Sequence, residues 1–451
     1  MRAVGEPRRA RRLPRVLHFF DISVLASASM GPAYSLASTM GPMVVAAGFG
    51  APLALLVLSA IMLCIAVSFS YLSRVAPNAG SSYSWIRMAF GAHAGAYGAW
   101  LLLLSNFFAT MAIAVPAGIY TLALVAPAHE QDPVWAAVVG AVWILASSAL
   151  LYAGVRPTAL VTLLALALEI GVLLIAALAA ALHAPVPAHV TAQSTPLPAS
   201  FGIAGFVTAM TLAVWMSDGW EVSASTSEEV NDTSTASGRG GITGLVFSTL
   251  VLLACMYAFE HLGSLQGFAD NQADALAYVG SLLGGPWWRV AIVVTVLLST
   301  LSTLWTTILY LTRSVYAMGR DGVLPRMLGA LDARDEPLWS MGVVAVLVTL
   351  CELVTGFSKS AADQLTLVLN ASSVFLGLLF VLTALAAAKR FWHEPVARLG
   401  GVLVPLAGAI ALLGVLAATV AVEDHKLAGY ACAGALLGIP FALWRGRVRR
   451  G

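Results

Sequence analysis

The chain has 451 residues, of which 59% are hydrophobic and 10% charged, and its mean hydropathy is +0.87. Soluble domains carry about 25% charged residues, so this composition excludes a soluble enzyme or a nucleic-acid-binding domain and indicates an integral membrane protein. The formal net charge of +2 is less informative than the distribution of the charges along the chain.

Apolar stretches long enough to cross a bilayer fill most of the sequence. A crossing helix needs about 20 such residues. We predict an all-α fold with twelve spans and no sizeable soluble domain. The spans are expected at about 16–46, 51–73, 93–126, 133–153, 157–182, 201–230, 241–262, 286–317, 339–357, 361–388, 400–422 and 427–445.

Basic residues are distributed unevenly between the two sets of loops. If both termini lie on one side, only Arg289, Lys359 and Lys426 fall on the other, leaving 21 of the 24 basic residues with the termini. Basic residues accumulate on the cytoplasmic side of membrane proteins. We therefore expect a multi-pass protein of the cell membrane with both termini in the cytoplasm. The first apolar run shows no clean cleavage site, which argues against a signal peptide.

The first span is interrupted near its middle by Ser27-Ala-Ser-Met-Gly-Pro32. Proline fits best in the first turn of a helix. We therefore expect one half-helix to end near Ser29 and another to begin at Pro32. The free N–H groups of that second start can hold an anion such as a carboxylate. A simple proline kink is the alternative.

Spans 3 and 5 each contain a polar residue of interest. Asn106 in span 3 faces either a cavity or a neighbouring helix. Glu169 in span 5 lies thirteen residues from Arg156, or about 20 Å along a helix, well inside a hydrocarbon core of about 30 Å. Ionisable residues at such depth are functional by default. We favour proton transfer for Glu169 over a purely structural role.

Span 6 is interrupted at Ser217, Asp218 and Gly219, with Glu221 close behind. Carboxylates in hydrocarbon cost a few kcal/mol each, so this segment is expected to line a protein cavity. Asp218 and Glu221 can each pair with a substrate cation. For Glu221, a helix cap or a tie between helices is equally consistent with the sequence.

The remaining spans add a polar stripe but no metal or catalytic pattern. Span 8 carries Trp305 within a run of small polar residues, namely Ser299, Ser302, Thr303, Thr306 and Thr307. The histidines and cysteines show no ligand spacing, so we expect no metal, no cofactor and no catalytic residues.

The two interrupted spans, 1 and 6, are five spans apart. An odd number of spans per repeat inverts the second copy, which is the arrangement of many secondary transporters. The expected organisation is as follows: a basic N-terminal segment (1–15), a first five-helix repeat (16–182), an inverted second repeat (201–388), two accessory spans (400–445) and a short tail (446–451).

Three motifs resemble the amino acid–polyamine–organocation superfamily of permeases. They are Pro-Asn-Ala-Gly-Ser-Ser-Tyr-Ser-Trp at 77–85, Gly-Trp-Glu at 219–221 with Glu-Glu at 228–229, and Arg-Ser-Val-Tyr-Ala-Met-Gly-Arg-Asp-Gly-Val-Leu-Pro at 313–325. The resemblance covers about residues 15–390. It implies the leucine-transporter-type fold, with five plus five inverted spans and two further spans.

The resemblance also implies a substrate site between the two breaks. Backbone amides at Ser29, Met30 and Gly31 would hold a substrate carboxylate, and carbonyls at Ser217, Asp218 and Gly219 an amino group. The first break departs from the usual glycine-serine-glycine, and Asp218 replaces a residue that is usually neutral. The full expected set of substrate-binding residues is Ser29, Met30, Gly31, Asn106, Trp215, Ser217, Asp218, Gly219, Glu221 and Trp305, with Glu169 for proton coupling.

These features predict a secondary active transporter of amino acids, driven by a proton gradient rather than by sodium, with a small-molecule substrate in a lipid bilayer. The alternative within transport is a polyamine or other organic-amine carrier or exchanger. A membrane sensor would require a soluble signalling domain, and an ATP-driven pump a phosphate-binding loop; the sequence contains neither. Oligomeric state is left open.

Overall fold

The computed structural model describes residues 12–130, 132–185, 202–231, 235–357, 361–422 and 425–447. Within these ranges the chain forms helices and no strand, apart from one isolated parallel bridge between Leu17 and Val230. Most of the predicted N-terminal segment (1–11) and the end of the predicted tail (448–451) lie outside the described residues.

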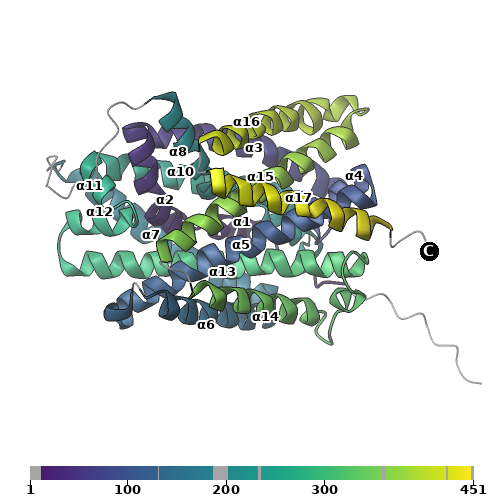
Figure 1. Cartoon of the computed structure of the whole chain (residues 1–451), viewed down its shortest axis with the longest axis horizontal. Coiled ribbons are helices and arrows are strands. Elements are labelled where there is room, and N and C mark those ends of the chain that lie inside the picture. The colour runs from purple at the N-terminus through teal and green to yellow at the C-terminus, as the bar shows by residue number, and fades with distance from the viewer. Residues whose placement is uncertain are drawn as a thin grey trace, which may run out of the picture.

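Long helices run side by side along the longest axis of the molecule (Figure 1). The first part of the chain contributes α1 (Phe19–Ser29), α2 (Pro32–Ala47), α3 (Ala51–Val75), α4 (Ser81–Phe90), α5 (Ala92–Val125), α6 (Pro133–Tyr152) and α7 (Val155–Leu182).

The second part contributes a similar number of helices. They are α8 (Ile203–Met216), α9 (Val222–Ser225), α10 (Ala236–Leu262), α11 (Leu265–Asp270), α12 (Ala275–Leu283), α13 (Pro286–Arg320), α14 (Leu338–Thr355), α15 (Ala361–Phe391), α16 (Val404–Val422) and α17 (His425–Arg447). Short 3-10 turns, including η3 (Ser227–Glu229) and η4 (Arg326–Gly329), connect some of them.

Nine helical stretches in the described chain are long and apolar enough to cross a membrane. The first of these runs through α1, α2 and α3 without a polar loop, and α8 is apolar but shorter. Apolar side chains such as Leu164, Leu168 and Ile175 on α7 are exposed on the outer surface, as expected for helices that face lipid. The chain is therefore an all-helical, multi-pass membrane protein.

The short helix α1 lies at the centre of the bundle, where α10, α7 and α13 pack around it (Figure 1). Residues 24–29 of α1 are all buried, and so are residues 299–319 of α13. A glycine on α10 allows this close packing, because a Cβ added at Gly244 would lie 2.5 Å from the Cβ of Ala26 on α1. The bundle core is thus built around an interrupted helix.

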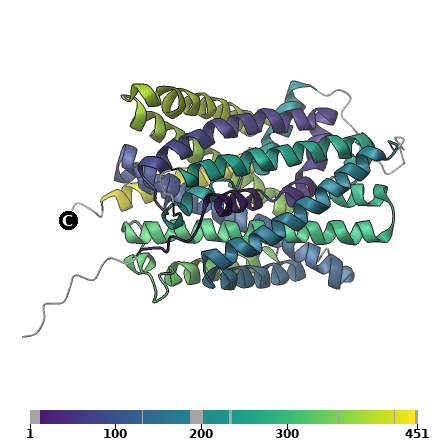
Figure 2. The ribbon, with the colours of Figure 1, turned by 180° about the vertical axis from the view of Figure 1, so that it is seen from behind.

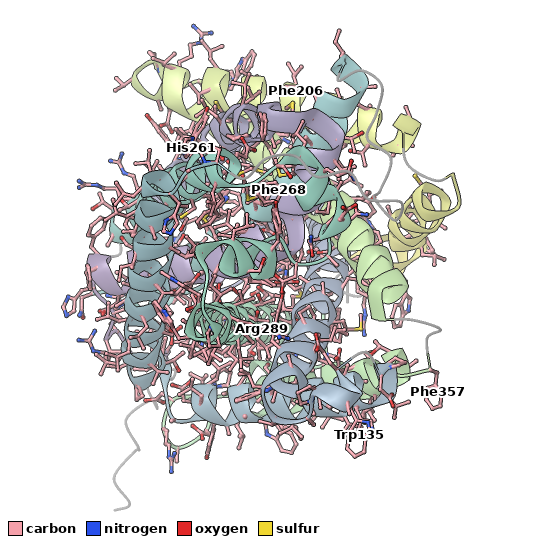
Figure 3. The ribbon with its side chains drawn as sticks, turned by 90° about the vertical axis from the view of Figure 1, so that its left-hand side faces the viewer. Trp135, Phe206, His261, Phe268, Arg289 and Phe357 are labelled. Carbon is pink, nitrogen blue, oxygen red and sulfur yellow. The ribbon has the colours of Figure 1, made fainter. Side chains whose placement is uncertain are left out.

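The two ends of the bundle differ. The short helices α11 and α12 cover one end, and α4 lies at the opposite end together with the end of α17 (Figures 1 and 2). Figure 3 looks onto the end with α11 and α12 and labels His261, Arg289 and Phe268 of α11 there. We call these the α12 end and the α4 end.

Candidate functional site

The first interrupted span breaks where the sequence predicts. Helix α1 ends at Ser29 and α2 begins at Pro32, so both predicted boundaries are confirmed. Between them Gly31 adopts a left-handed conformation, with φ +54° and ψ 63°. Glycine adopts this backbone geometry without a steric penalty, and the following proline starts the new helix.

The second break is also confirmed. Helix α8 ends at Met216, and the chain resumes helical structure only at Val222 of α9. Gly219 lies between them with φ +102°, a conformation that residues with a side chain rarely adopt. The polar segment Ser217–Glu221 is therefore non-helical backbone inside the bundle.

The two breaks touch each other. A Cβ placed on Gly219 would lie 2.4 Å from the carbonyl oxygen of Ser29, which is far closer than atoms can approach. Likewise, a Cβ on Gly31 would lie 2.4 Å from Oγ1 of Thr303 on α13. Glycine at both positions lets α13 and the two broken spans meet without intervening side chains.

A small cavity lies beside this contact. Its volume is about 30 Å³, enough for roughly one water-sized sphere, so a substrate can occupy it only if the walls move apart. Helices α1, α2, α5, α8, α13 and α15 and the second break supply its walls. The lining residues are Ser29, Met30, Tyr34, Ser105, Asn106, Ala109, Ile113, Trp215, Asp218, Gly219, Glu221, Thr303, Thr307, Tyr310, Ser372 and Leu376.

The cavity brings together most of the residues expected from the sequence. Those that line it are Ser29, Met30, Asn106, Trp215, Asp218, Gly219 and Glu221. Gly31, Ser217 and Trp305 do not. The Ser217 hydroxyl bonds to that of Ser59 on α3 at 3.1 Å, and the Trp305 indole donates to Thr162 on α7 at 2.8 Å.

Asp218 and Glu221 converge on one backbone group. The N–H of Gly219 donates to Oδ1 of Asp218 at 2.6 Å and to Oε2 of Glu221 at 3.0 Å. No ion pair within the described chain involves either carboxylate. The cavity wall therefore carries two neighbouring acidic groups without a protein cation.

Glu169 contacts the start of α2 and is not among the residues that line the cavity. Its Oε1 accepts a hydrogen bond from the backbone N–H of Ala33 at 2.8 Å and from the hydroxyl of Ser299 on α13 at 2.7 Å. The side chain is fully buried, and Oε2 has no partner among the described residues. The protein's own carboxylate thus occupies the N-terminus of α2.

The sequence reading omitted several cavity residues from its predicted site. Thr303, Thr307 and Tyr310 on α13 line the cavity, as does Tyr34 on α2. Positions 299, 303 and 307 are spaced by four residues, and this spacing places them on one helix face. The same spacing places Thr303 and Thr307 on a different helix face from Trp305, which points toward α7.

A buried ion network lies near the C-terminal end of α13. Arg313 on α13 bonds to both carboxylate oxygens of Glu229, at 2.9 and 3.0 Å, and to Glu336 at 2.9 Å. These three side chains are at most 5% exposed. Burial raises the pKa of Glu336, while Arg313 opposes this shift by stabilising the charged form. Glu229, which belongs to the motif at 228–229, thus pairs with an arginine of the motif at 313–325.

Glu352 on α14 is a buried acid that the sequence analysis missed. It is fully buried, and neither carboxylate oxygen has a partner within the described chain. A Cβ on Gly140 of α6 would lie 2.5 Å from its Oε1 and 2.7 Å from the carbonyl oxygen of Ala114 on α5. Glu352 could have been identified from the sequence, because it is a single glutamate within an otherwise apolar predicted span.

Comparison with known proteins identifies the relatives of this chain. It is 24% identical over 308 residues to the branched-chain amino acid permease BcaP of Lactococcus lactis, covering 63% of this chain and 64% of that permease, slightly less than two thirds. It is 27% identical over 382 residues to an uncharacterised transporter of Mycobacterium tuberculosis, covering 81% of each chain. An uncharacterised amino acid permease of Bacillus subtilis, YecA, is 27% identical over 327 residues, covering 70% of this chain and 72% of that protein.

The family described as amino acid permease matches residues 17–426, which include both breaks and the cavity. This match and the permease relatives make the chain a membrane transporter and not an enzyme. The expected resemblance is confirmed, and the chain belongs to the amino acid permease family.

Proposed function

We propose that this protein is a secondary active transporter that takes up amino acids, or amines related to them, by alternating access in the cell membrane. The observation that carries the proposal is the contact between two interrupted spans beside a small cavity that has polar residues in its wall. Broken helices at such a position supply backbone dipoles to a substrate. The permease relatives support a substrate of the amino acid class.

The proposed architecture has twelve spans with both termini in the cytoplasm. Five spans from 16–182 and five from 201–388 form two inverted repeats, followed by two accessory spans. The asymmetric distribution of lysine and arginine supports this orientation. In this arrangement the α12 end faces outward and the α4 end faces the cytoplasm.

Glu169 is the proposed site of proton coupling. Its carboxylate connects α7 to the start of α2 and to α13, three elements that would change their relative positions between outward-open and inward-open forms. Protonation weakens the bond from the Ala33 N–H, because a neutral acid accepts a hydrogen bond less strongly than a carboxylate. Proton binding therefore loosens the contact between α7 and α2.

The small volume of the cavity indicates that its walls must move during the transport cycle. A volume of about 30 Å³ is an order of magnitude below that of common small-molecule sites. Substrate access then requires movement of the cavity walls, with one side open at a time. Such gated access is the defining feature of a carrier.

Uptake into proteoliposomes tests the proposal. The purified protein is reconstituted without sodium, and accumulation of radiolabelled amino acids and amines is followed after an inward proton gradient is imposed. We expect at least one solute to be concentrated inside, and the accumulation to collapse when a protonophore is added. Accumulation that needs sodium would overturn proton coupling, and absence of any accumulation would overturn the transport proposal.

A further inference from the structure

The cavity wall is acidic. Asp218 and Glu221 supply its two carboxyl groups, and no lysine, arginine or histidine lines it among the described residues. The polar groups that accompany them are neutral hydroxyls and one amide, including Ser29, Thr307 and Tyr310. A free amino acid carries a carboxylate as well as an ammonium group, and this cavity offers no positive group to the carboxylate.

The backbone N–H groups at the first break do not replace the missing positive group. Five backbone N–H groups lie between Met30 and Ser35, because Pro32 has none. Each of the five already donates to an acceptor inside the protein. The bonds run from Met30 to Ser27 O (3.2 Å), Gly31 to Ala28 O (3.1 Å), Ala33 to Glu169 (2.8 Å), Tyr34 to Ser299 Oγ (3.1 Å) and Ser35 to Gly31 O (2.7 Å).

Among these five acceptors, Glu169 is the only carboxylate. The N-terminus of a helix attracts one anion through its free N–H groups and its dipole. At α2 this position is taken by a carboxylate of the protein itself, fixed on its other side by Ser299. A substrate carboxylate brought to the same break would find the Ala33 N–H already bonded and would meet the carboxylate of Glu169.

We propose that the preferred substrate is an organic ammonium ion without a free carboxylate, an amine rather than its parent amino acid. Asp218 and Glu221 would receive the ammonium group, and the absence of a cation in the wall would reject the carboxylate. This inference rests on the proposed function as a carrier and assigns the chemical class of what is carried. It makes the acidic pair the determinant of specificity.

Matched compounds test the inference directly. Each series holds one side chain constant and contains an amino acid, its methyl ester and its decarboxylated amine; leucine with 3-methylbutylamine and lysine with cadaverine provide two series. Binding to the purified protein is measured by thermal stabilisation and by competition. We expect the ester and the amine to bind at least about tenfold more tightly than the parent acid, because both lack its negative charge.

Variants of the wall separate charge from shape. Asp218→Asn and Glu221→Gln should each reduce the preference for the amine over the acid by about tenfold, since either change removes one negative group. Asn106→Ala changes an uncharged part of the same wall, so it should alter both affinities in proportion and keep their ratio. An unchanged ratio in both acidic variants would overturn the inference.

The outcomes also separate this inference from the carrier proposal. Tighter binding of the parent amino acids, together with their accumulation in proteoliposomes, would overturn the inference and leave the carrier proposal intact. Tight binding of amines without accumulation of any solute would support the recognition chemistry and overturn transport.

Discussion

The phenol of Tyr34 on α2 donates a hydrogen bond of 2.7 Å to the backbone carbonyl of Ala112 on α5. That carbonyl is available because the residue four positions later is Pro116, which has no N–H to donate within the helix. Tyr34 also packs edge-on against Trp215, with ring centroids 6.3 Å apart. One proline in α5 thereby creates the anchor for a tyrosine in the cavity wall.

A double-mutant cycle tests this anchor. Tyr34→Phe leaves the Ala112 carbonyl without a hydrogen-bond donor. This change should destabilise the protein by about 1–3 kcal/mol, the cost of an unsatisfied buried acceptor. In a Pro116→Ala background the restored helix N–H satisfies that carbonyl, so the same change should cost less. Melting temperatures of the four proteins give the coupling, and additive effects would show that the two residues act independently.

Asp218→Asn should weaken binding of the best ligand by about 1–3 kcal/mol, because a hydrogen bond to a charged acceptor is replaced by one to a neutral amide. The control is Glu260→Gln, which makes the same kind of change at a buried carboxylate of α10 outside the cavity. Its affinity should match that of the unmodified protein. Equal affinity in a folded Asp218→Asn variant would remove this residue from direct contact with the ligand.

Glu169→Gln should abolish accumulation driven by a proton gradient while exchange of bound substrate continues. The amide mimics the protonated acid and still accepts from Ala33, but it cannot release a proton. Uptake and exchange are measured in the same proteoliposomes. Concentrative uptake by this variant would show that Glu169 has a purely structural role.

The ion pairs near the C-terminal end of α13 should differ sharply in their contribution to stability. Arg313→Leu leaves Glu229 and Glu336 buried without their cation, and such a loss costs about 3–5 kcal/mol. Arg320→Leu removes a partly exposed pair with Glu228, for which about 0–1 kcal/mol is usual. Thermal unfolding compares them, and similar melting temperatures for the two variants would contradict this ranking.

Cysteine labelling tests the proposed orientation. Cysteines placed at Ala128 and Gln272 should react with an impermeant reagent in intact cells, whereas those at Gly5 and Arg334 should react only after lysis. Ala128, Gln272 and Arg334 are all exposed, so lack of reaction would report the membrane side rather than burial. Gly5 lies outside the described residues, as does Asp424, a further expected outer position. Labelling of Gly5 from outside would reverse the topology.

Several local features of this structure follow from the sequence alone. The membrane class follows from composition, since long apolar runs cannot fold in water as exposed surface. The break at Met30–Gly31 follows from Gly-Pro chemistry, and the break at Ser217–Gly219 from the cost of placing Asp218 in a continuous lipid-embedded helix. These are properties of short segments, so a single sequence contains them.

Partners distant in the chain required the tertiary structure. Glu169 is 136 positions from Ala33 and 130 from Ser299, and nothing in the local sequence distinguishes these partners from other polar groups. For the same reason the sequence did not show that α2's amide donors are already occupied, or that Trp305 points away from the cavity. Local composition decided that the helices break and cross the membrane. The packing of those helices decided which polar groups meet, because that depends on helix rotation and on contacts between segments more than a hundred residues apart.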